Sequence, residues 1–584
     1  IIRVNADPKV DSGDSHAPVP FYVTTRGYGV LVDTLRHATF YCGDAHPRPE
    51  QPMTSSEAVI GSPQMMRARD RAKEGRVLVE VPRCLGVDVY LFAGPDLRSA
   101  VQRYNLFSGG GALPPDWGLG FWYRPEMHLN ADEVLALGKE FRANGIPCDV
   151  LGLEPGWQTH AYSCTFVWDK QRFPNPAGFI AQAREMGYRI NLWEHAFTYP
   201  ASPIFAPLVP YSGNFAVWDG LVPDFAGSQA RKIFGDYHGR ELIDMGVSGF
   251  KLDECDNSDF TQGWSFPDNS QFPSGVDGEQ MHAQFGLRYQ DAILEQYEAR
   301  KQPTYSLVRS SGALAGPYPF VLYSDLYDHR VFIRALLNAG FSGLLWCPEV
   351  RDAQSEEDLV RRLQSVVFSP LAMVNAWYIR NPPWKQIERA ANNADKFSPG
   401  WEQLQARCRE IIGWRMQMLP YVQAAFAEYK RTGLPPFRGL IMDWPNERRL
   451  ADVDDQYMMG DRLMIAPLFA GERERRIVMP PGQWHDFWTG APVKGDEILV
   501  PASTEKIPVF AKSDSVVPWA AVTSHNDSQT VRELAVRVYG DGSLGWSSGD
   551  ETGALRLRWN ASQKKGEVSG SAQKWRVTSW QQIG

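Results

Sequence analysis

The sequence predicts an α/β fold: a (β/α)8 TIM barrel with an N-terminal β-sandwich portion and C-terminal all-β domains. Three observations support this prediction. The middle of the 584-residue chain alternates short apolar runs with amphipathic helical stretches, as parallel strands and their connecting helices do. There are eight such runs, the number that closes a barrel. Both ends of the chain are instead rich in β-branched and aromatic runs broken by Gly and Pro.

Residues 1–113 are expected to form the N-terminal β-sandwich domain. The runs "FYVTTRGYGVLVDT" and "RVLVEVP" carry the strand signal. No obvious first strand precedes them, so we expect either the tail of a longer domain or a compact variant. The chain begins "IIRVNADPKV", without Met or a signal-like apolar segment, so any targeting peptide is expected to be absent or already removed.

Residues 114–433 are expected to form the barrel. Its helical stretches include "ADEVLALGKEFRANG" and "NPAGFIAQAREMG", which both end in Gly, a common helix stop. An open doubly wound sheet would give the same periodicity, but the count of eight strands favours the barrel. The expected strands are 118–123, 149–154, 189–194, 249–254, 305–309, 321–326, 341–346 and 370–375.

Two connections in the barrel, 195–228 and 256–283, are too long for ordinary loops. Both are rich in Pro, Gly and aromatic residues, and we expect them to protrude from the C-terminal face, where barrel active sites lie. After the barrel, the residue pattern again predicts β-strands. We expect a proximal β-sandwich over 434–515 and a distal β domain over 516–584.

Composition and charge exclude several classes of partner. A net charge of −8 offers no basic face to nucleic acid or an anionic membrane, and no apolar run approaches the length of a membrane span. The seven Cys are odd in number and form no C-x-x-C pair, so we expect neither a disulfide framework nor a zinc site. We therefore expect a soluble protein without a metal or other cofactor, whose compartment and oligomeric state stay open. Aromatic residues make up 12%, which fits either sugar-binding clefts or a Trp-rich core.

Polar side chains at the ends of the predicted barrel strands form the candidate active site. In a TIM barrel these ends converge on one face. Hydrolysis of a glycosidic bond needs two carboxyl groups there: one attacks or activates water, and the other donates a proton to the leaving oxygen. Trp side chains at the same rim would stack on sugar rings. The candidates are Glu154, Glu194, Asp253, Glu254, Arg309, Asp325 and Glu349, with Trp122, Trp157, Trp193 and Trp346 at the rim.

The stretch "GFKLDECDNSDF" gathers four acids behind one strand, which raises the alternative of a metal site. An EF-hand loop needs a Gly and a closing Glu that this stretch lacks, and the eleven His show no zinc-binding spacing. We therefore do not expect a metal site in this stretch. For Glu254, Asp256 and Asp259 a purely structural role is an equal alternative.

Several segments resemble glycoside hydrolase family 31, the retaining α-glycosidases. The family's nucleophile strand is similar to "GFKLDE", and its next two strands, the second ending in the acid/base Asp, are similar to "VRSSGALAGPYPFVLYSDL". A later helix is similar to "WRMQMLPYVQAAFAEYKRTGLPPFRGL", and the sandwich after the barrel to "DDQYMMGDRLMIAPL" and "PGQWHDFWTG". The resemblance runs from about residue 20 almost to the C-terminus.

This resemblance implies a role for each residue that matches a motif. Asp253 would be the nucleophile, Asp325 the general acid/base and Arg309 a ligand of the sugar in the −1 subsite. Lys251 would hold the charge of Asp253, and apolar neighbours would raise the pKa of Asp325. Retention through a covalent glycosyl-enzyme would place the two carboxyls about 5–5.5 Å apart. The apolar neighbours meant here are Leu322, Tyr323 and Leu326.

The chain departs from the family's glucosidases at three strand ends. Glu154 stands where they usually have an Asp that hydrogen-bonds the 4- and 6-hydroxyls. The seventh strand ends in Trp346, Cys347, Pro348 and Glu349 instead of "W-S-H-D". The third ends in Trp193 and Glu194, where an apolar or small residue is commoner. The pattern "NLWE…KLDECD…YSDLYDH…WCPE" looks most like the α-galactosidase branch.

We therefore expect an exo-acting α-galactosidase whose partner is an oligosaccharide or other glycoside. Glu194 and Trp193 would contact the axial 4-hydroxyl, with Cys255 and Glu254 near the ring. The alternative is an α-glucosidase or α-glucan transglycosylase, and an α-N-acetylgalactosaminidase has less support. A non-catalytic carbohydrate-binding protein is a different class. It is opposed by the presence of both carboxylates of the expected pair.

Overall fold

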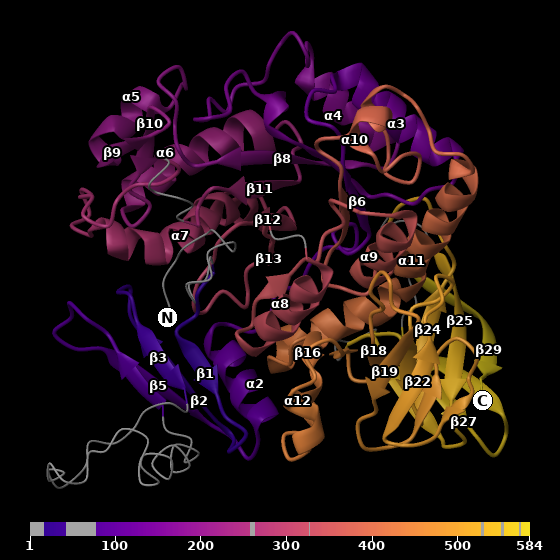
Figure 1. The fold of residues 1–584 in the computed structure, drawn as a ribbon. Coiled ribbons are helices and arrows are strands. Elements are labelled where there is room, and N and C mark those ends of the chain that lie inside the picture. Colours follow the sequence, from indigo (N-terminus) through magenta and orange to yellow (C-terminus); the bar gives the residue numbers. More distant parts are fainter. Residues whose placement is uncertain are drawn as a thin grey trace, which may run out of the picture.

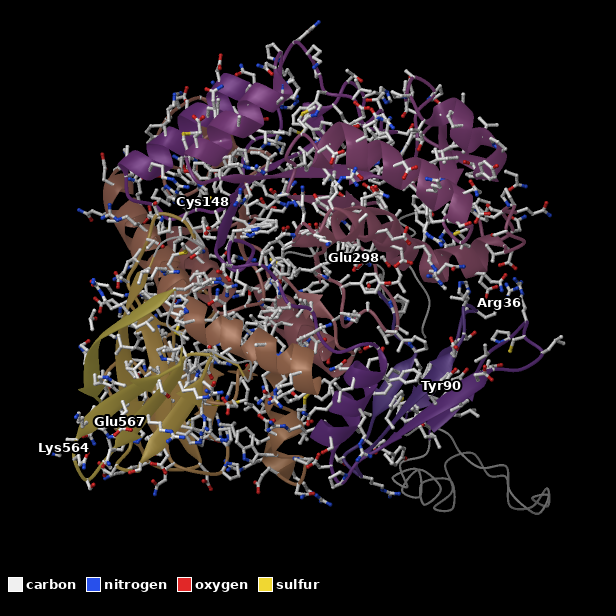
Figure 2. All side chains as sticks on the ribbon, turned by 180° about the vertical axis from the view of Figure 1, so that it is seen from behind. Arg36, Tyr90, Cys148, Glu298, Lys564 and Glu567 are labelled. Carbon is white, nitrogen blue, oxygen red and sulfur yellow. The ribbon has the colours of Figure 1, made fainter. Side chains whose placement is uncertain are left out.

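The computed structural model describes residues 17–42, 77–256, 263–325, 328–526, 531–549, 554–570 and 574–583. A parallel sheet of eight strands lies at its centre and is surrounded by helices, with β regions from the two ends of the chain at the lower left and lower right of Figure 1. Figure 2 shows the same arrangement from behind. Tyr90 marks the N-terminal sheet, and Lys564 and Glu567 mark the distal domain on the other side.

Each of the eight strands of the central sheet overlaps one of the eight runs predicted from the sequence, so the predicted barrel is confirmed. Neighbouring strands are parallel, in the order β14-β13-β12-β11-β8-β7-β6-β15. A parallel bridge between Val350, after β14, and Val374 of β15 joins the two edges. The strands are β6 (Phe121–Arg124), β7 (Val150–Leu153), β8 (Arg189–His195), β11 (Gly249–Asp253), β12 (Ser306–Val308), β13 (Phe320–Leu322), β14 (Leu345–Trp346) and β15 (Ala372–Asn375).

Local signals set where the surrounding helices begin and end. At the start of α3 (Ala131–Ala143), the Asn130 side chain accepts from the Glu133 amide, and the Glu133 side chain accepts from the Asn130 amide. Gly145 follows that helix with a φ of +64°, which Gly adopts without strain. None of the helices in the described ranges is both long and apolar enough to cross a membrane. The other main helices are α4 (Pro176–Glu185), α6 (Ser228–His238), α7 (Gly278–Ala299), α8 (His329–Phe341), α9 (Glu356–Val366) and α11 (Trp401–Thr432).

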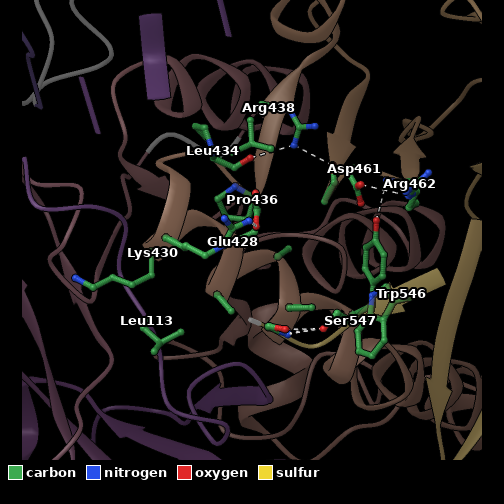
Figure 3. Close-up of a pocket in the computed structure, with 18 of the residues that line it drawn as sticks. Leu113, Glu428, Lys430, Leu434, Pro436, Arg438, Asp461, Arg462, Trp546 and Ser547 are labelled. Atoms are coloured by element: carbon green, nitrogen blue, oxygen red, sulfur yellow. Dashed lines mark hydrogen bonds and ion pairs between the residues drawn. The ribbon is translucent and has the colours of Figure 1, made fainter. Parts of the chain in front are cut away.

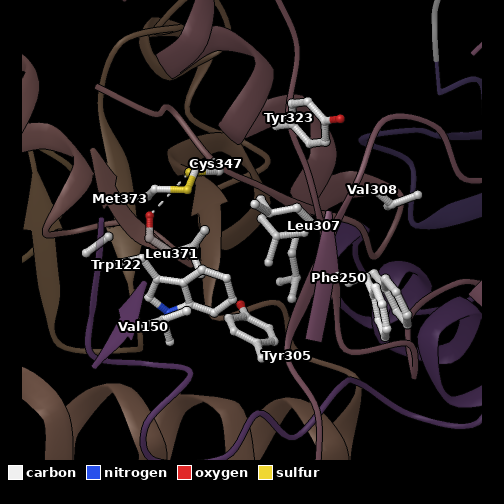
Figure 4. Close-up of a cluster of buried hydrophobic side chains, with 14 of the residues drawn as sticks. Trp122, Val150, Phe250, Tyr305, Leu307, Val308, Tyr323, Cys347, Leu371 and Met373 are labelled. Atoms are coloured by element: carbon white, nitrogen blue, oxygen red, sulfur yellow. Dashed lines mark hydrogen bonds between the residues drawn. The ribbon is translucent and has the colours of Figure 1, made fainter. Parts of the chain in front are cut away.

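The interior of the barrel is a packed apolar core. Figure 4 shows Trp122 within it, together with Val150, Tyr305 and Leu371. Trp122 is completely buried, its indole N–H donates to the Gly118 carbonyl at 3.0 Å, and its ring meets Tyr305 edge-on at 6.1 Å. Trp122 therefore belongs to the core and does not lie at the rim of the site, contrary to the expectation from the sequence.

The two long connections carry structure of their own. Residues 195–228 include α5 (Phe205–Leu208) and a hairpin of β9 (Ser212–Val217) and β10 (Gly220–Pro223). In the second connection, residues 257–262 lie outside the described residues, among them Asp259. The described remainder leads into α7.

The N-terminal β region docks against the barrel through an ion pair. Arg36 Nη1 lies 2.5 Å from Asp277 Oδ2 and 3.3 Å from Glu279 Oε2, at the start of α7. This region contains the sheet β1-β2-β5, the pair β3-β4 and the helix α2. Their bounds are β1 (Phe21–Val23), β2 (Tyr28–Asp33), β3 (Thr39–Cys42), β4 (Val77–Glu80), β5 (Asp88–Ala93) and α2 (Leu97–Phe107).

The region after the barrel forms two groups of strands. The proximal group has the sheet β16-β17-β18-β23-β20-β21 and the pair β19-β22, and the distal group has the sheets β24-β25-β29 and β26-β27-β28. Their bounds are β16 (Phe437–Gly439), β17 (Tyr457–Met459), β18 (Leu463–Ile465), β19 (Glu474–Val478), β20 (Trp484–Asp486), β21 (Pro492–Val493), β22 (Glu497–Pro501), β23 (Val509–Lys512), β24 (Ser515–Ala520), β25 (Arg532–Tyr539), β26 (Leu544–Ser547), β27 (Arg556–Asn560), β28 (Lys565–Ser569) and β29 (Trp575–Gln582).

A buried carboxyl group ties the distal group to the barrel. Asp149, just before β7, accepts from the backbone N of Asn526 at 2.6 Å and from its side-chain amide at 3.0 Å. Arg532 in turn donates to the Asn526 side-chain oxygen at 2.8 Å and to the Met416 carbonyl at 2.7 Å. Burial raises the pKa of Asp149 to about 7.

Candidate active site

Three charged side chains meet at the carboxyl ends of three neighbouring strands. Asp253 is the last residue of β11, Arg309 follows β12, and Asp325 follows β13. Arg309 Nη1 lies 2.6 Å from Asp325 Oδ2 and 3.5 Å from Asp253 Oδ1. Because one nitrogen reaches both carboxylates, those two oxygens lie no more than about 6 Å apart, within reach of a single glycosidic bond.

Asp253 is held from two sides. Its Oδ2 accepts from the Trp193 indole N–H at 2.6 Å, and its Oδ1 accepts from the Glu254 backbone N at 2.9 Å. Glu254 itself has a φ of +51°, a backbone conformation that residues other than Gly rarely adopt. These two donors orient the carboxylate at the end of its strand.

Asp325 has a cationic environment. Arg309 contacts its Oδ2, and Arg351 Nη1 lies 2.5 Å from its Oδ1. Burial alone would raise the pKa of Asp325, but the two guanidinium groups outweigh it and hold that pKa well below its ordinary value. The expectation that apolar neighbours raise this pKa is therefore wrong for the arrangement described here. Leu326, one of those neighbours, lies outside the described residues.

Lys251 pairs with Glu154 and not with Asp253, the partner expected from the sequence. Lys251 Nζ lies 3.2 and 3.3 Å from the two Glu154 oxygens, and Arg124 donates to the same carboxylate. Burial opposes ionisation of Glu154, but Arg124 and Lys251 together lower its pKa. Arg124 also donates to Asn191 at 2.6 Å. The ammonium of Lys251 sits 4.9 Å above the Tyr323 ring. Lys251 thus compensates the charge of Glu154.

Glu194 does not face the candidate site. Successive side chains of a strand point to opposite faces, so Trp193 and Glu194 of β8 cannot both point inward. Trp193 faces Asp253, whereas Glu194 faces the surrounding helices. One Glu194 oxygen lies 3.1 Å from His238 Nε2 of α6, and the other accepts from the Tyr289 hydroxyl of α7 at 2.8 Å. Glu194 is completely buried there, so it cannot contact a sugar hydroxyl as expected.

The remaining expected residues lie buried around the cluster. Burial, followed by the charge of Asp253, raises the pKa of Glu254 well above its ordinary value. Burial likewise raises the pKa of Glu349, whose oxygens lie 3.3 and 3.4 Å from the Asn375 side-chain amide. Cys255 is 2% exposed and Trp346 is 5% exposed, so neither offers much surface to a ligand in this structure.

The reading of strand ends missed three charged residues. Arg124 is the last residue of β6, so the rule that found Asp253 would have found it as well. Asp256, which we treated as a possible bystander, is completely buried and accepts from Arg309 Nε at 2.6 Å. Arg351 had no motif to identify it. Within the described ranges, no group of three His, Cys, Asp or Glu is arranged to hold a metal ion.

A cavity of about 470 Å³ lies outside the barrel face, between α11, the turn that joins β17 to β18, and β26. Figure 3 shows Arg438, Asp461, Arg462 and Trp546 among its lining residues. Arg438 is already paired with Asp443 at 2.6 Å, and Arg462 lies 3.2 Å from Asp461. This cavity lacks the convergent carboxylate pair of the barrel face.

Replacing Arg351 tests the electrostatics of Asp325. Arg351→Met removes a positive charge that lowers the pKa of Asp325, so that pKa should rise. If Asp325 is the general acid that the family resemblance implies, it works only while protonated, and the alkaline limb of the kcat/KM profile should move up by about one pH unit or more. Arg330→Met, which removes an Arg paired with Asp455 and Glu472 outside the cluster, should leave the limb in place. An unchanged or lowered limb in Arg351→Met would contradict the assigned contact.

Two family models match the chain, one over the barrel and one over the strands that follow it. Residues 111–425 match the family model described as "Glycosyl hydrolases family 31 TIM-barrel domain", and residues 433–517 match the "Glycosyl hydrolase family 31 C-terminal domain". "Alpha-xylosidase XylQ" of Lactiplantibacillus pentosus is 24% identical over 88% of the chain, and "Alpha-glucosidase 2" of Bacillus thermoamyloliquefaciens is 26% identical over 74%. The chain spans 65% and 56% of the lengths of these two relatives.

A solved structure shares the fold. The Flavobacterium johnsoniae GH31 dextranase FjDex31A, complexed with glucose, superposes with a TM-score of 0.78 at 21% identity, covering 96% of this chain and 70% of that one. The names of these relatives and of this structure refer to α-xylosidase, α-glucosidase and dextranase. They do not support the α-galactosidase branch that the sequence pattern favoured.

Proposed function

The chain belongs to glycoside hydrolase family 31, and from this premise we propose that it is a retaining, exo-acting α-glycosidase that hydrolyses terminal α-glucosidic bonds. The observation that carries the proposal is the pair of carboxylates joined by one guanidinium, Asp253 and Asp325 on either side of Arg309. Two carboxyl groups within about 6 Å fit the double displacement of retaining enzymes better than the wider spacing of inverting ones.

In the first step, a carboxylate oxygen of Asp253 attacks the anomeric carbon while the bond from that carbon to the leaving oxygen breaks. Asp325 gives its proton to the leaving oxygen, and a covalent glycosyl-enzyme forms. In the second step, Asp325 takes a proton from water, the water oxygen attacks the anomeric carbon, and Asp253 leaves. The donors Trp193 and Glu254 N keep the Asp253 carboxylate aligned throughout.

In this mechanism Asp325 must carry a proton before the first step. The contacts of Asp325 with Arg309 and Arg351 favour its ionised form, which cannot donate. The mechanism therefore requires substrate binding to weaken at least one of the two contacts. Arg351 is the one we assign, because Arg309 is also anchored by Asp256 at 2.6 Å. Catalytic hydrogen bonds of this kind commonly rearrange when the substrate arrives.

The choice of glucose over galactose rests on Glu194 and Glu154. The reason to expect galactose was a contact between Glu194 and the axial 4-hydroxyl, and both Glu194 oxygens are instead engaged with His238 and Tyr289. Glu154 stands at the position where the family's glucosidases hold the 4- and 6-hydroxyls, and its charge is compensated there by Arg124 and Lys251. Xylose lacks the 6-hydroxymethyl group. An α-xylosidase is a second candidate because one relative carries that name.

A side-by-side assay tests the proposal. The initial rates on the 4-nitrophenyl α-glycosides of glucose, xylose and galactose are compared, and NMR follows the anomer of the first product. We expect the α-glucoside to be fastest and the α-anomer to appear first. Products longer than the substrate would identify the transglycosylase alternative. A dominant galactoside rate would overturn the sugar assignment, and a β-anomer formed first would overturn retention.

A further inference from the structure

Aromatic rings form an unbroken series from the candidate nucleophile to solvent. Trp193, which donates to Asp253, lies 5.4 Å from the Tyr162 ring. Tyr162 meets Trp218 edge-on at 5.0 Å, and Trp218 meets Trp264 edge-on at 5.6 Å. We call Trp193, Tyr162, Trp218 and Trp264 the aromatic platform. Its members come from four parts of the chain: the connection after β7, β8 itself, the turn between β9 and β10, and the connection between β11 and α7.

The platform has one buried member, and the other three reach the surface. Trp193 is 1% exposed, whereas Tyr162 is 43% and Trp264 is 40% exposed, with the partly buried Trp218 between them. Single exposed aromatic side chains are common on protein surfaces, but neighbouring ones that touch and continue into a catalytic cluster mark a binding surface. The platform therefore has a buried end at Asp253 and an open end at Trp264.

The backbone holds Trp218 in an unfavourable conformation. Trp218 and Asp219 form the turn between β9 and β10 with φ values of +49° and +59°, where Asn-Gly is the preferred pair. The Ser163 hydroxyl donates to the Trp218 carbonyl at 3.1 Å, and a Cβ on Gly220 would lie only 2.4 Å from the Ser163 oxygen. The buried ring of His195 packs against the Trp218 ring, with 5.1 Å between the ring centroids. A strained turn that is fixed from several sides is a common device for aiming a side chain at a ligand.

We propose that the aromatic platform binds the sugar rings on the leaving-group side of the bond that is cut, so that the substrate is an uncharged α-linked oligosaccharide. This inference rests on the proposed function, which places one terminal ring at the buried end beside Asp253. Because an exo-acting enzyme holds only that ring there, the following rings lie toward the exposed end. The C–H faces of sugar rings stack on aromatic faces, and the apolar platform offers such faces at Tyr162 and Trp264.

Two substrates with the same terminal sugar separate this role from a structural one. An α-glucosyl fluoride has a leaving group without any ring, whereas a gluco-trisaccharide places rings over the platform. In Trp264→Ala we expect kcat/KM for the best trisaccharide to fall about tenfold or more, mainly through KM, while the fluoride rate stays within about twofold. Trp264→Phe should recover most of the loss. The control Phe397→Ala removes a ring of similar exposure, 37%, that packs against Trp401 outside the platform, and both rates should be unchanged.

The outcomes distinguish a failure of the platform proposal from a failure of the proposed hydrolysis. Equal losses on the fluoride and the trisaccharide in Trp264→Ala, or no loss on either, would overturn the platform. If the wild type hydrolyses no α-glycosyl fluoride, the proposed hydrolysis fails by itself. Calorimetric titration of the trisaccharide into Asp253→Asn, with and without Trp264→Ala, then decides the platform: weaker binding in the double variant supports it, and equal binding rejects it.

Discussion

Asp253→Asn is expected to lower kcat on every α-glycoside by about 10⁴-fold or more, with the melting temperature nearly unchanged. The substitution keeps the size of the side chain, and the Asn oxygen can still accept from Trp193 or Glu254 N. What it removes is the negatively charged oxygen that attacks the anomeric carbon in the proposed mechanism. An amide is a far weaker nucleophile, and the covalent intermediate should no longer form.

The neighbouring acid provides the matched control for this variant. Glu254 adjoins Asp253 and is 7% exposed, as Asp253 is, so Glu254→Gln removes an acid of similar burial at the next position. We expect a loss of no more than about tenfold there. A 5-fluoro-α-glucosyl fluoride should trap the glycosyl-enzyme in the wild type, and mass spectrometry of the peptides should place the label on Asp253. A label on Glu254, or near-normal turnover by Asp253→Asn, would refute the assignment of the nucleophile.

Asp325→Ala should lose more activity on substrates whose leaving group must be protonated than on substrates whose leaving group needs no proton. A sugar leaving group departs as a poor alkoxide unless it is protonated, so its kcat/KM should fall about 10²–10⁴-fold. Fluoride needs no proton, and the first step with α-glucosyl fluoride should slow much less. The second step lacks its base, so the glycosyl-enzyme should accumulate with that substrate.

Azide addresses the second role of Asp325. Azide is already an anion and needs no base, so it should attack the accumulated intermediate of Asp325→Ala and release α-glucosyl azide. The wild type should show no such acceleration. As a control, Glu349→Gln changes an acid that is hydrogen-bonded to Asn375 and should show neither dependence on the leaving group nor rescue by azide. Equal losses on fluoride and sugar substrates in Asp325→Ala, without rescue, would exclude Asp325 as acid/base.

The sequence predicts the strands and the central residues because both depend on local patterns. The eight barrel strands are short, buried apolar runs, and Asp253, Arg309 and Asp325 each follow or end one of them. The error at Glu194 was avoidable in principle. Two neighbours on one strand point to opposite faces, and once Trp193 faces the barrel interior, Glu194 must face the helices outside.

Other properties of the site depend on residues that are distant in sequence. Arg351 is 26 positions from Asp325, and its contact reverses the expected direction of the Asp325 pKa. Likewise, Lys251 lies two residues before Asp253, yet its ammonium pairs with Glu154, 97 positions away. Such pairings follow from how strands and loops are placed around the barrel. Reading one segment at a time cannot supply them.

The link between Asp149 and Asn526 has a consequence for how the protein can be divided into fragments. A fragment that ends with the second family match at residue 517 would lack both Asn526 and Arg532, and the buried Asp149 carboxyl would lose two of its hydrogen bonds. Because burial raises the pKa of Asp149 from 3.8 to about 7 in the folded chain, the stability that this carboxyl contributes is complete below its ordinary pKa and is lost as the pH rises through about 7. The barrel and the distal strands therefore form one unit for expression and purification.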